Sequence, residues 1–211
     1  MFEVDGVKVL YHSCIRFAKE KKIYVDPYKI KENYNDADII LITHPHYDHF
    51  SIDDIKKVIG NYTKIFTQEE TKNELINIGV NEENIICVKP YESYGYEKCI
   101  DIETVPAYNK NKQFHPKEKE WVGYIIKMEG TTYYIAGDTD YTKEASKVKC
   151  DVAFVPIGGT YTMNYVEAAA LINKIKPKYV IPIHYGTIVG NPEDGILFKE
   201  LLDKKIECII Q

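Results

Sequence analysis

Arginine is almost missing from this chain of 211 residues. Arg16 is the only arginine, and lysine supplies the rest of the fixed positive charge. The 27 basic residues face 32 acidic ones, which gives a formal net charge of −5. Proteins that hold nucleic acid through its phosphates usually present a basic surface. The charge balance therefore argues against a general nucleic-acid-binding role.

Long apolar runs and organised cysteines are missing as well. No stretch has the length of a membrane-spanning helix, and residues 1–6 do not resemble a secretion signal. The five cysteines contain no C-x-x-C pair, so the sequence predicts neither a disulfide framework nor a thiolate zinc site. We therefore expect a cytoplasmic protein with no membrane partner.

The most informative segment is a short run of histidines. Three of the six histidines in the chain and one aspartate fall within six residues. Imidazole and carboxylate groups are preferred ligands of Zn²⁺, and they also serve iron and manganese. The sequence therefore predicts a metal site here. The four side chains are His44, His46, Asp48 and His49.

The local pattern around this run places it on a loop. Residues 38–43 are apolar and β-branched, which is typical of a buried strand, and Ser51 favours a helix N-cap. His44 and His46 are two apart, so they project the same way from extended backbone. Asp48 follows a predicted turn and can point elsewhere. This arrangement suits two adjacent metals better than one.

The rest of the chain alternates short strands with a few helices, without repeats or linkers. The pattern alone indicates one mixed domain of helices and strands over residues 1–211. Strands are predicted at 7–12, 14–18, 22–26, 38–43, 63–67, 84–88, 99–105, 121–129, 131–136, 151–156, 178–183 and 206–210. Helices are predicted at 51–59, 68–78, 142–148, 163–175 and 193–203.

The histidine run resembles the H-x-H-x-D-H signature of the metallo-β-lactamase superfamily. Residues 9–13 and 23–27 look like the opening strands of that superfamily, and 135–139 and 180–187 look like its later metal motifs. The closest likeness is to its small stand-alone hydrolases, the branch that includes ascorbate-6-phosphate lactonase. The resemblance implies an α+β fold, the four-layered αββα sandwich of the metallo-β-lactamase type.

The later motifs supply two further predicted ligands. Asp138 follows an apolar strand and Gly137, and a carboxylate there can bridge two cations. His184 ends the apolar segment 179–183 and matches the final histidine ligand of the family. A turn or helix-cap role for Asp138 and a structural role for His184 are the alternatives.

The sequence leaves two alternatives for the third ligand of the first metal ion. Many members of the family carry a histidine where this chain has Asn109. His115 lies six residues further on, and a longer loop could bring it back into the site. The first site is therefore completed either by His115 or by Asn109 with water.

Four more residues are candidates for supporting the ligands or binding substrate. His12 and Asp26 match positions near the same end of the fold, where Asp26 would hydrogen-bond a ligand imidazole. Gly158 and Gly159 precede a predicted helix, where exposed N–H groups could bind an anion.

These features predict a hydrolase with two divalent metal ions. Zinc is the first choice of metal for both ions, and manganese is the second choice. Two cations lower the pKa of a bound water, so that a bridging hydroxide becomes the nucleophile. Asp48 would hold this hydroxide and pass on a proton. The expected substrate is a small anionic ester, lactone or phosphoester. The sequence is also compatible with a homo-oligomer. The alternatives are a phosphodiesterase or nuclease of the same superfamily, and a metal-binding protein without hydrolytic activity.

Overall fold

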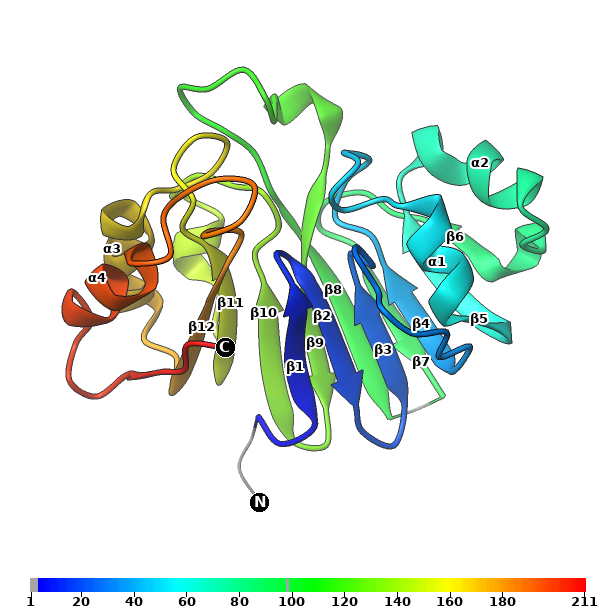
Figure 1. Cartoon of the computed structure of the whole chain (residues 1–211), viewed down its shortest axis with the longest axis horizontal. Helices are drawn as coiled ribbons and strands as arrows, with labels where there is room; N and C mark the ends of the chain where they lie inside the picture. Colours follow the sequence, from blue (N-terminus) through cyan, green and yellow to red (C-terminus); the bar gives the residue numbers. More distant parts are fainter. Residues whose placement is uncertain (1–3, 98) are drawn as a thin grey trace. The chain divides into compact units, whose positions relative to one another are not determined.

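The computed structural model describes residues 4–97 and 99–211. The chain forms two compact units, an N-terminal unit over Val4–Val88 and a C-terminal unit over Lys89–Gln211. Each unit is built on one β-sheet whose helices pack on one face (Figure 1). Within the described ranges, no helix is long and apolar enough to cross a membrane.

The N-terminal unit contains a six-stranded sheet in the order β1-β2-β3-β4-β5-β6. The first three strands form an antiparallel meander, and β3 to β6 run parallel to one another. Helices α1 and α2 connect the parallel strands. The bounds are β1 (Val7–Tyr11), β2 (Cys14–Ala18), β3 (Lys22–Val25), β4 (Ala37–Leu41), α1 (Ile52–Val58), β5 (Ile59–Thr67), α2 (Lys72–Asn77) and β6 (Ile85–Cys87).

Both helices of this unit bury apolar side chains against the same face of the sheet. Ile55 of α1 and Leu75 of α2 share one core with Ile40 and Ile65 of the central strands. The start of α1 is fixed by Ser51, whose side chain accepts a hydrogen bond from the Asp54 N–H. The N-cap predicted from the sequence is therefore confirmed.

The C-terminal unit contains a seven-stranded sheet in the order β13-β12-β11-β10-β9-β8-β7. Strands β7 to β10 form an antiparallel meander, whereas β10 to β13 are parallel. The bounds are β7 (Ser93–Tyr96), β8 (Ile100–Pro106), β9 (Val122–Met128), β10 (Thr131–Ile135), β11 (Val152–Pro156), α3 (Tyr165–Ile175), β12 (Tyr179–Ile183), α4 (Asp194–Glu200) and β13 (Glu207–Cys208).

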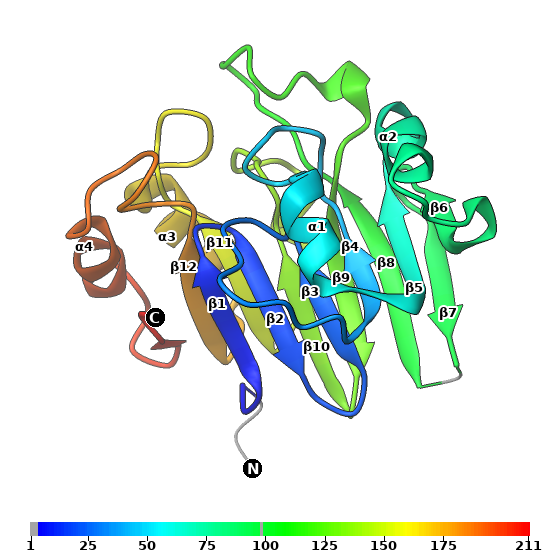
Figure 2. The same cartoon turned by 45° about the vertical axis from the view of Figure 1, so that its right-hand side comes forward.

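Helices α3 and α4 lie side by side against the parallel part of this sheet (Figures 1 and 2). Leu171 and Ile172 of α3 and Phe198 of α4 are fully buried in one apolar core. Asn164 caps α3 in a capping box with Glu167, so the first N–H groups of this helix are already satisfied.

Most predicted elements are confirmed, and the differences have local causes. The predicted helix at 142–148 is wrong, because only the 3₁₀ turn Ala145–Lys147 forms there, started by a hydrogen bond from the Ala145 N–H to the Thr142 hydroxyl. Strand β7 was not predicted. The predicted helix at 68–78 is split into the 3₁₀ turn Glu69–Thr71 and α2.

The cysteines are free thiols in both units, and most are shielded from water. Burial raises the pKa of the Cys14 and Cys150 thiols to about 12, and that of Cys87 and Cys208 to about 11. Cys99 differs from these four because it is exposed, in the turn between β7 and β8.

Candidate metal centre

In the N-terminal unit, the predicted donors follow the carboxyl ends of neighbouring parallel strands. β3 ends at Val25 and runs into Asp26, and β4 ends at Leu41 and runs into Thr43 and His44. Because parallel strands deliver their carboxyl ends to one edge of a sheet, these segments meet there. The local sequence thus gathers polar side chains beyond an apolar sheet.

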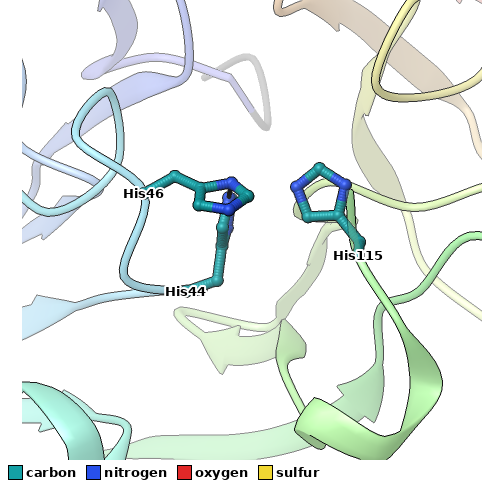
Figure 3. A group of neighbouring side chains, drawn as sticks. All are labelled: His44, His46 and His115. Carbon is teal, nitrogen blue, oxygen red and sulfur yellow. Dashed lines mark hydrogen bonds between the residues drawn. The ribbon is translucent and has the colours of Figure 1, made fainter. Parts of the chain in front are cut away.

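The loop from His44 to His49 turns back on itself. The N–H groups of His49 and Phe50 both donate to the His46 carbonyl, at 2.9 and 2.8 Å. The turn brings the rings of His44 and His46 together (Figure 3), with Nε2 of His44 3.0 Å from Nδ1 of His46. The ring centroids of His44 and His49 are 4.0 Å apart. His44 and His49 are buried, while His46 is half-buried.

Asp48 lies next to two further imidazoles of the same unit. Its Oδ2 is 3.4 Å from Nε2 of His12 and 3.6 Å from Nε2 of His49. His12 is the first residue of the two-residue turn between β1 and β2, with a φ of 54°. Residues other than glycine seldom adopt this left-handed conformation, although histidine does so more often than most. The hairpin turn therefore directs a buried imidazole toward the Asp48 carboxylate.

The Asp26 carboxylate accepts three hydrogen bonds from the segment that contains Thr43 and His49. Its Oδ1 accepts from the Thr43 N–H at 2.8 Å, and its Oδ2 accepts from the Thr43 hydroxyl and from Nδ1 of His49, both at 2.7 Å. Burial raises the pKa of Asp26, while His49 and these hydrogen bonds oppose that rise. Asp26 is also held at a φ of 45°, so its backbone is fixed in a left-handed conformation.

These contacts fix the tautomers of two imidazoles. The Thr43 hydroxyl gives its single proton to Asp26, so toward Nδ1 of His44, 3.0 Å away, it can only accept. Nδ1 of His49 donates to Asp26. In their neutral forms, both rings therefore carry the proton on Nδ1 and a lone pair on Nε2.

In the C-terminal unit, the predicted donors again follow strand ends. β10 leads into Asp138, β12 leads into His184, and β8 leads into the loop that carries Asn109 and His115. Oδ2 of Asp138 is 3.3 Å from Nε2 of His115 and 3.1 Å from Nε2 of His184. All of these side chains are buried. The longer loop thus does bring His115 to Asp138.

Asn109 orients the His115 ring. The Oδ1 of Asn109 accepts hydrogen bonds from the backbone N–H and from Nδ1 of His115, each at 3.1 Å. The backbone N–H of Asn109 donates to the His115 carbonyl at 2.7 Å. The backbone donor identifies this amide atom as oxygen, so Nδ1 of His115 must carry a proton. Neutral His115 then turns the lone pair of Nε2 toward the Asp138 carboxylate, and two acceptors at this distance repel unless a proton or a cation lies between them.

The donor sets of both units fit divalent metal ions. In each unit, a buried imidazole nitrogen with a lone pair points at another ligand atom 3.0–3.6 Å away. Two nitrogens on one tetrahedral zinc ion, each about 2.05 Å from it, would be roughly 3.3 Å apart. The donors are nitrogen and oxygen atoms without thiolates, which suits zinc or manganese.

His184 is held in place by a glycine. Its φ is 57°, and a Cβ on Gly158 would lie 2.3 Å from the His184 carbonyl oxygen. No side chain fits at that distance, so Gly158 permits the segment after β11 to lie close to the His184 backbone. The role of Gly158 seen in the structure is therefore one of packing.

The anion-binding role predicted for the glycine pair does not hold for Gly159. Its N–H donates to the Met163 carbonyl at 3.0 Å, so this group is used within the loop. The helix that follows begins only at Tyr165, after the Asn164 cap. The Gly159 N–H is therefore not available to an anion in this conformation.

Sequence reasoning missed several supporting residues. Gln68 donates from Nε2 to the carbonyls of Ile42 and Thr43, both at 3.0 Å, which fixes the end of β4. Asp140 accepts from Nζ of Lys112 and from the Lys110 N–H, which closes the loop that carries His115. Only its place two residues after Asp138 could have drawn attention to Asp140.

Comparison with known proteins places this site in a family. The family described as "Beta-lactamase superfamily domain" matches residues 6–184. The chain belongs to the beta-lactamase superfamily. A UPF0173 metal-dependent hydrolase from Pyrococcus furiosus is 31% identical over 97% of this chain and 95% of its own length. The corresponding protein from Thermococcus kodakarensis is 33% identical, with the same coverage.

Solved structures agree with this membership of the superfamily. A protein from Parabacteroides distasonis, assigned as a metal-dependent hydrolase, matches with a TM-score of 0.82 and 31% identity over 97% of this chain and 91% of its own. Igni18, a metallo hydrolase from Ignicoccus hospitalis, shares the fold with a TM-score of 0.77 at 23% identity, over 97% of this chain and 94% of its own. The predicted α+β class and metallo-β-lactamase type are confirmed. The chain is a metal-dependent hydrolase of the small stand-alone branch of the superfamily.

Proposed function

We propose that the two units together form one hydrolase domain, residues 1–211, that holds two divalent metal ions. The ligands would be those predicted from the sequence, His44, His46, Asp48 and His49 in the N-terminal unit and His115, Asp138 and His184 in the C-terminal unit. Asp138 would contact both ions, because a carboxylate can bridge two cations. Zinc is the first choice of metal and manganese the second.

The observation that carries this proposal is the set of fixed tautomers. His44, His49 and His115 each use Nδ1 to donate to a neighbouring oxygen, which leaves Nε2 as a ligand atom. Such second contacts are typical of metal-binding histidines. A proton-only network would not need three imidazoles prepared in the same way.

The residues of this chain would prepare the site for hydrolysis. When bound, the metal ions would supply an activated water and polarise the bond to be cleaved. Asp48 would orient this water and accept its proton. Its Oδ2 is 3.4 Å from Nε2 of the buried His12. Asp26 and Thr43 would keep the imidazoles of His44 and His49 in their ligand orientation.

The proposed substrate is a small anionic ester, lactone or phosphoester. Support comes from the relatives, which are named metal-dependent hydrolases and match over nearly their whole length, so no additional substrate domain accompanies the fold in them. The net charge of −5 gives no support to a general nuclease surface.

Metal content and activity of matched variants test the proposal. The protein loaded with zinc or manganese should hold close to two ions per chain by elemental mass spectrometry. Asp138→Ala should lower occupancy at both sites and remove most hydrolysis across a panel of lactones, carboxylic esters and bis-p-nitrophenyl phosphate. Asp101→Ala, at an exposed position of β8, is the control and should keep both. An Asp138→Ala protein with two ions and full turnover would refute the bridging role.

A further inference from the structure

Three tyrosines from separate segments of the N-terminal unit lie together beside the donor loop. Tyr11 ends β1, Tyr28 follows β3, and Tyr47 belongs to the loop with the ligands. The ring centroids of Tyr11 and Tyr28 are 5.9 Å apart, and those of Tyr28 and Tyr47 are 6.0 Å apart. Tyr47 is 65% exposed, and the other two are half-buried. We call Tyr11, Tyr28, Tyr47 and Lys29 the tyrosine patch.

Lys29 adds a positive charge to this patch. Its Nζ lies 5.6 Å from the ring centroid of Tyr11 and 5.8 Å from that of Tyr28, which is cation–π distance. Across residues 4–97 and 99–211, no carboxylate forms an ion pair with this ammonium. The charge is therefore available to a ligand above the rings.

The backbone at Lys29 is constrained to present the side chain in this way. Its φ is 53°, a left-handed conformation that lysine seldom adopts. The N–H groups of Lys29 and Ile30 each donate to the buried Asp54 carboxylate at 2.9 Å, which holds the turn. Strained backbone that the surroundings hold in place is often found at binding sites.

The tyrosine patch is continuous with the predicted metal ligands. Tyr47 lies between His46 and Asp48 in sequence. Tyr11 precedes His12, and Nε2 of His12 is 3.4 Å from the Asp48 carboxylate. A molecule that rests on the patch would therefore have one end beside Asp48.

We propose that the tyrosine patch selects the substrate, by packing an aromatic ring face-on against one of Tyr28 and Tyr47 and edge-on against the other, whose planes lie at 75°, and by pairing the anionic group of the substrate with Lys29. This inference rests on the proposed function, because it takes the neighbouring donors as the reaction site. It narrows the substrate class to aromatic compounds that bear a carboxylate or phosphate. Exposed tyrosines offer flat faces with little rotational freedom to lose, which suits recognition of a ring.

Ligand binding without turnover tests this proposal separately from the hydrolase assignment. The metal-loaded protein is titrated by calorimetry with benzoate, with its neutral analogue benzamide, and with acetate, which carries charge but no ring. We expect benzoate to bind at least fivefold more tightly than either. Lys29→Gln should remove the preference for benzoate over benzamide, and Tyr28→Leu and Tyr47→Leu should each remove the preference for benzoate over acetate.

Two control variants share the unit but not the patch. Lys31→Gln changes an exposed lysine two residues away, and Tyr62→Leu changes a tyrosine that is 87% exposed elsewhere. Both should bind like the parent protein. Equal affinity for benzoate and acetate, or an unchanged preference in Lys29→Gln, would overturn the proposal. A protein that shows the expected binding pattern but hydrolyses no ester would refute the proposed function and leave the binding surface standing.

Discussion

At the scale of single residues, Asn109 orients a buried histidine that lies in an irregular loop. Its amide oxygen holds both the backbone and the ring of His115, and its Nδ2 donates to the Tyr161 carbonyl at 2.9 Å. The ring of His115 is also buried and lies edge-on to Trp121, with 5.6 Å between the ring centroids.

The first prediction concerns this contact. Asn109→Ala should weaken one of the two proposed metal ions roughly 10–100-fold, because outer partners of ligand histidines contribute this much to affinity. His115→Ala should weaken the same ion further and leave the other bound. Metal titrations followed by elemental analysis give both values. Asn61→Ala, at an exposed position, is the control, and an Asn109→Ala protein that titrates like it would contradict the positioning role.

The second prediction concerns a buried hydroxyl. Within the described residues, the hydroxyl of Tyr134 has no hydrogen-bond partner, and burial raises its pKa. Tyr134→Phe should therefore leave the free energy of unfolding unchanged or raise it by up to about 1 kcal/mol, since an unpaired polar group is costly to bury. Tyr24→Phe should instead lower stability by about 1 kcal/mol, because that hydroxyl bonds Arg16 and Asp36 at 2.7 Å. Urea unfolding compares the two, and equal effects would contradict the reasoning.

At the scale of secondary-structure elements, the sequence is informative where apolar periodicity is strong. Strands 38–43 and 151–156 and the helix at 163–175 are found close to their predicted bounds because their apolar faces are buried. Strand β7 was missed since its side chains are exposed or half-buried and Gly95 interrupts the pattern. The 3₁₀ turn at Ala145–Lys147 was overestimated as a helix because composition alone does not show where a single turn stops.

The third prediction concerns the turn before α1. Asp54 accepts hydrogen bonds from Ser51, from Lys57 and from two backbone N–H groups. Asp54→Asn should lower the free energy of unfolding by about 1–3 kcal/mol at neutral pH, because it removes the charge from a multiply bonded carboxylate. Asp53→Asn, at the exposed neighbouring position, should change it by less than about 0.5 kcal/mol.

The pH dependence of this effect has a definite sign. Burial alone would raise the pKa of Asp54, but the bonds from Lys57, Ser51 and the backbone lower it below its ordinary value of 3.8. A group with a lowered folded pKa stabilises the protein fully above its unfolded pKa, and loses that contribution as pH falls through the folded value. The difference between the parent and Asp54→Asn should therefore shrink below about pH 4. A difference that grows on acidification would contradict this.

At the scale of the whole molecule, the candidate site depends on positions distant in sequence. The run at His44–His49 stands out as a candidate because its donor groups are adjacent in sequence, and Asp138 and His184 stand out because each follows an apolar strand. The supporting contacts of Thr43, Gln68 and Asp140 could not be predicted, since each depends on how separate strands are paired. No local pattern encodes which polar side chain will lie under which imidazole.

The fourth prediction follows from the proposed function. If two ions bind buried donors of the folded chain, chelation should destabilise it. An ion present at 1,000 times its dissociation constant contributes about 4 kcal/mol, so removal of both should lower the melting temperature markedly. Calorimetry before and after dialysis against EDTA measures this. Confirmed loss of both ions with no change in melting temperature would refute a stabilising role for the metals.

The distribution of thiol pKa values has a practical consequence for attaching probes. Four thiols are held protonated at neutral pH, whereas Cys99 is exposed in the turn just before β8, the strand whose other end leads to the His115 loop. Because thiolates are the reactive species, brief maleimide treatment should modify one site per native chain. Peptide mass spectrometry would identify it. The unaltered chain thus offers one labelling site for a dye or spin label. The seven residues of β8, roughly 23 Å of extended strand, separate this site from the loop that carries His115.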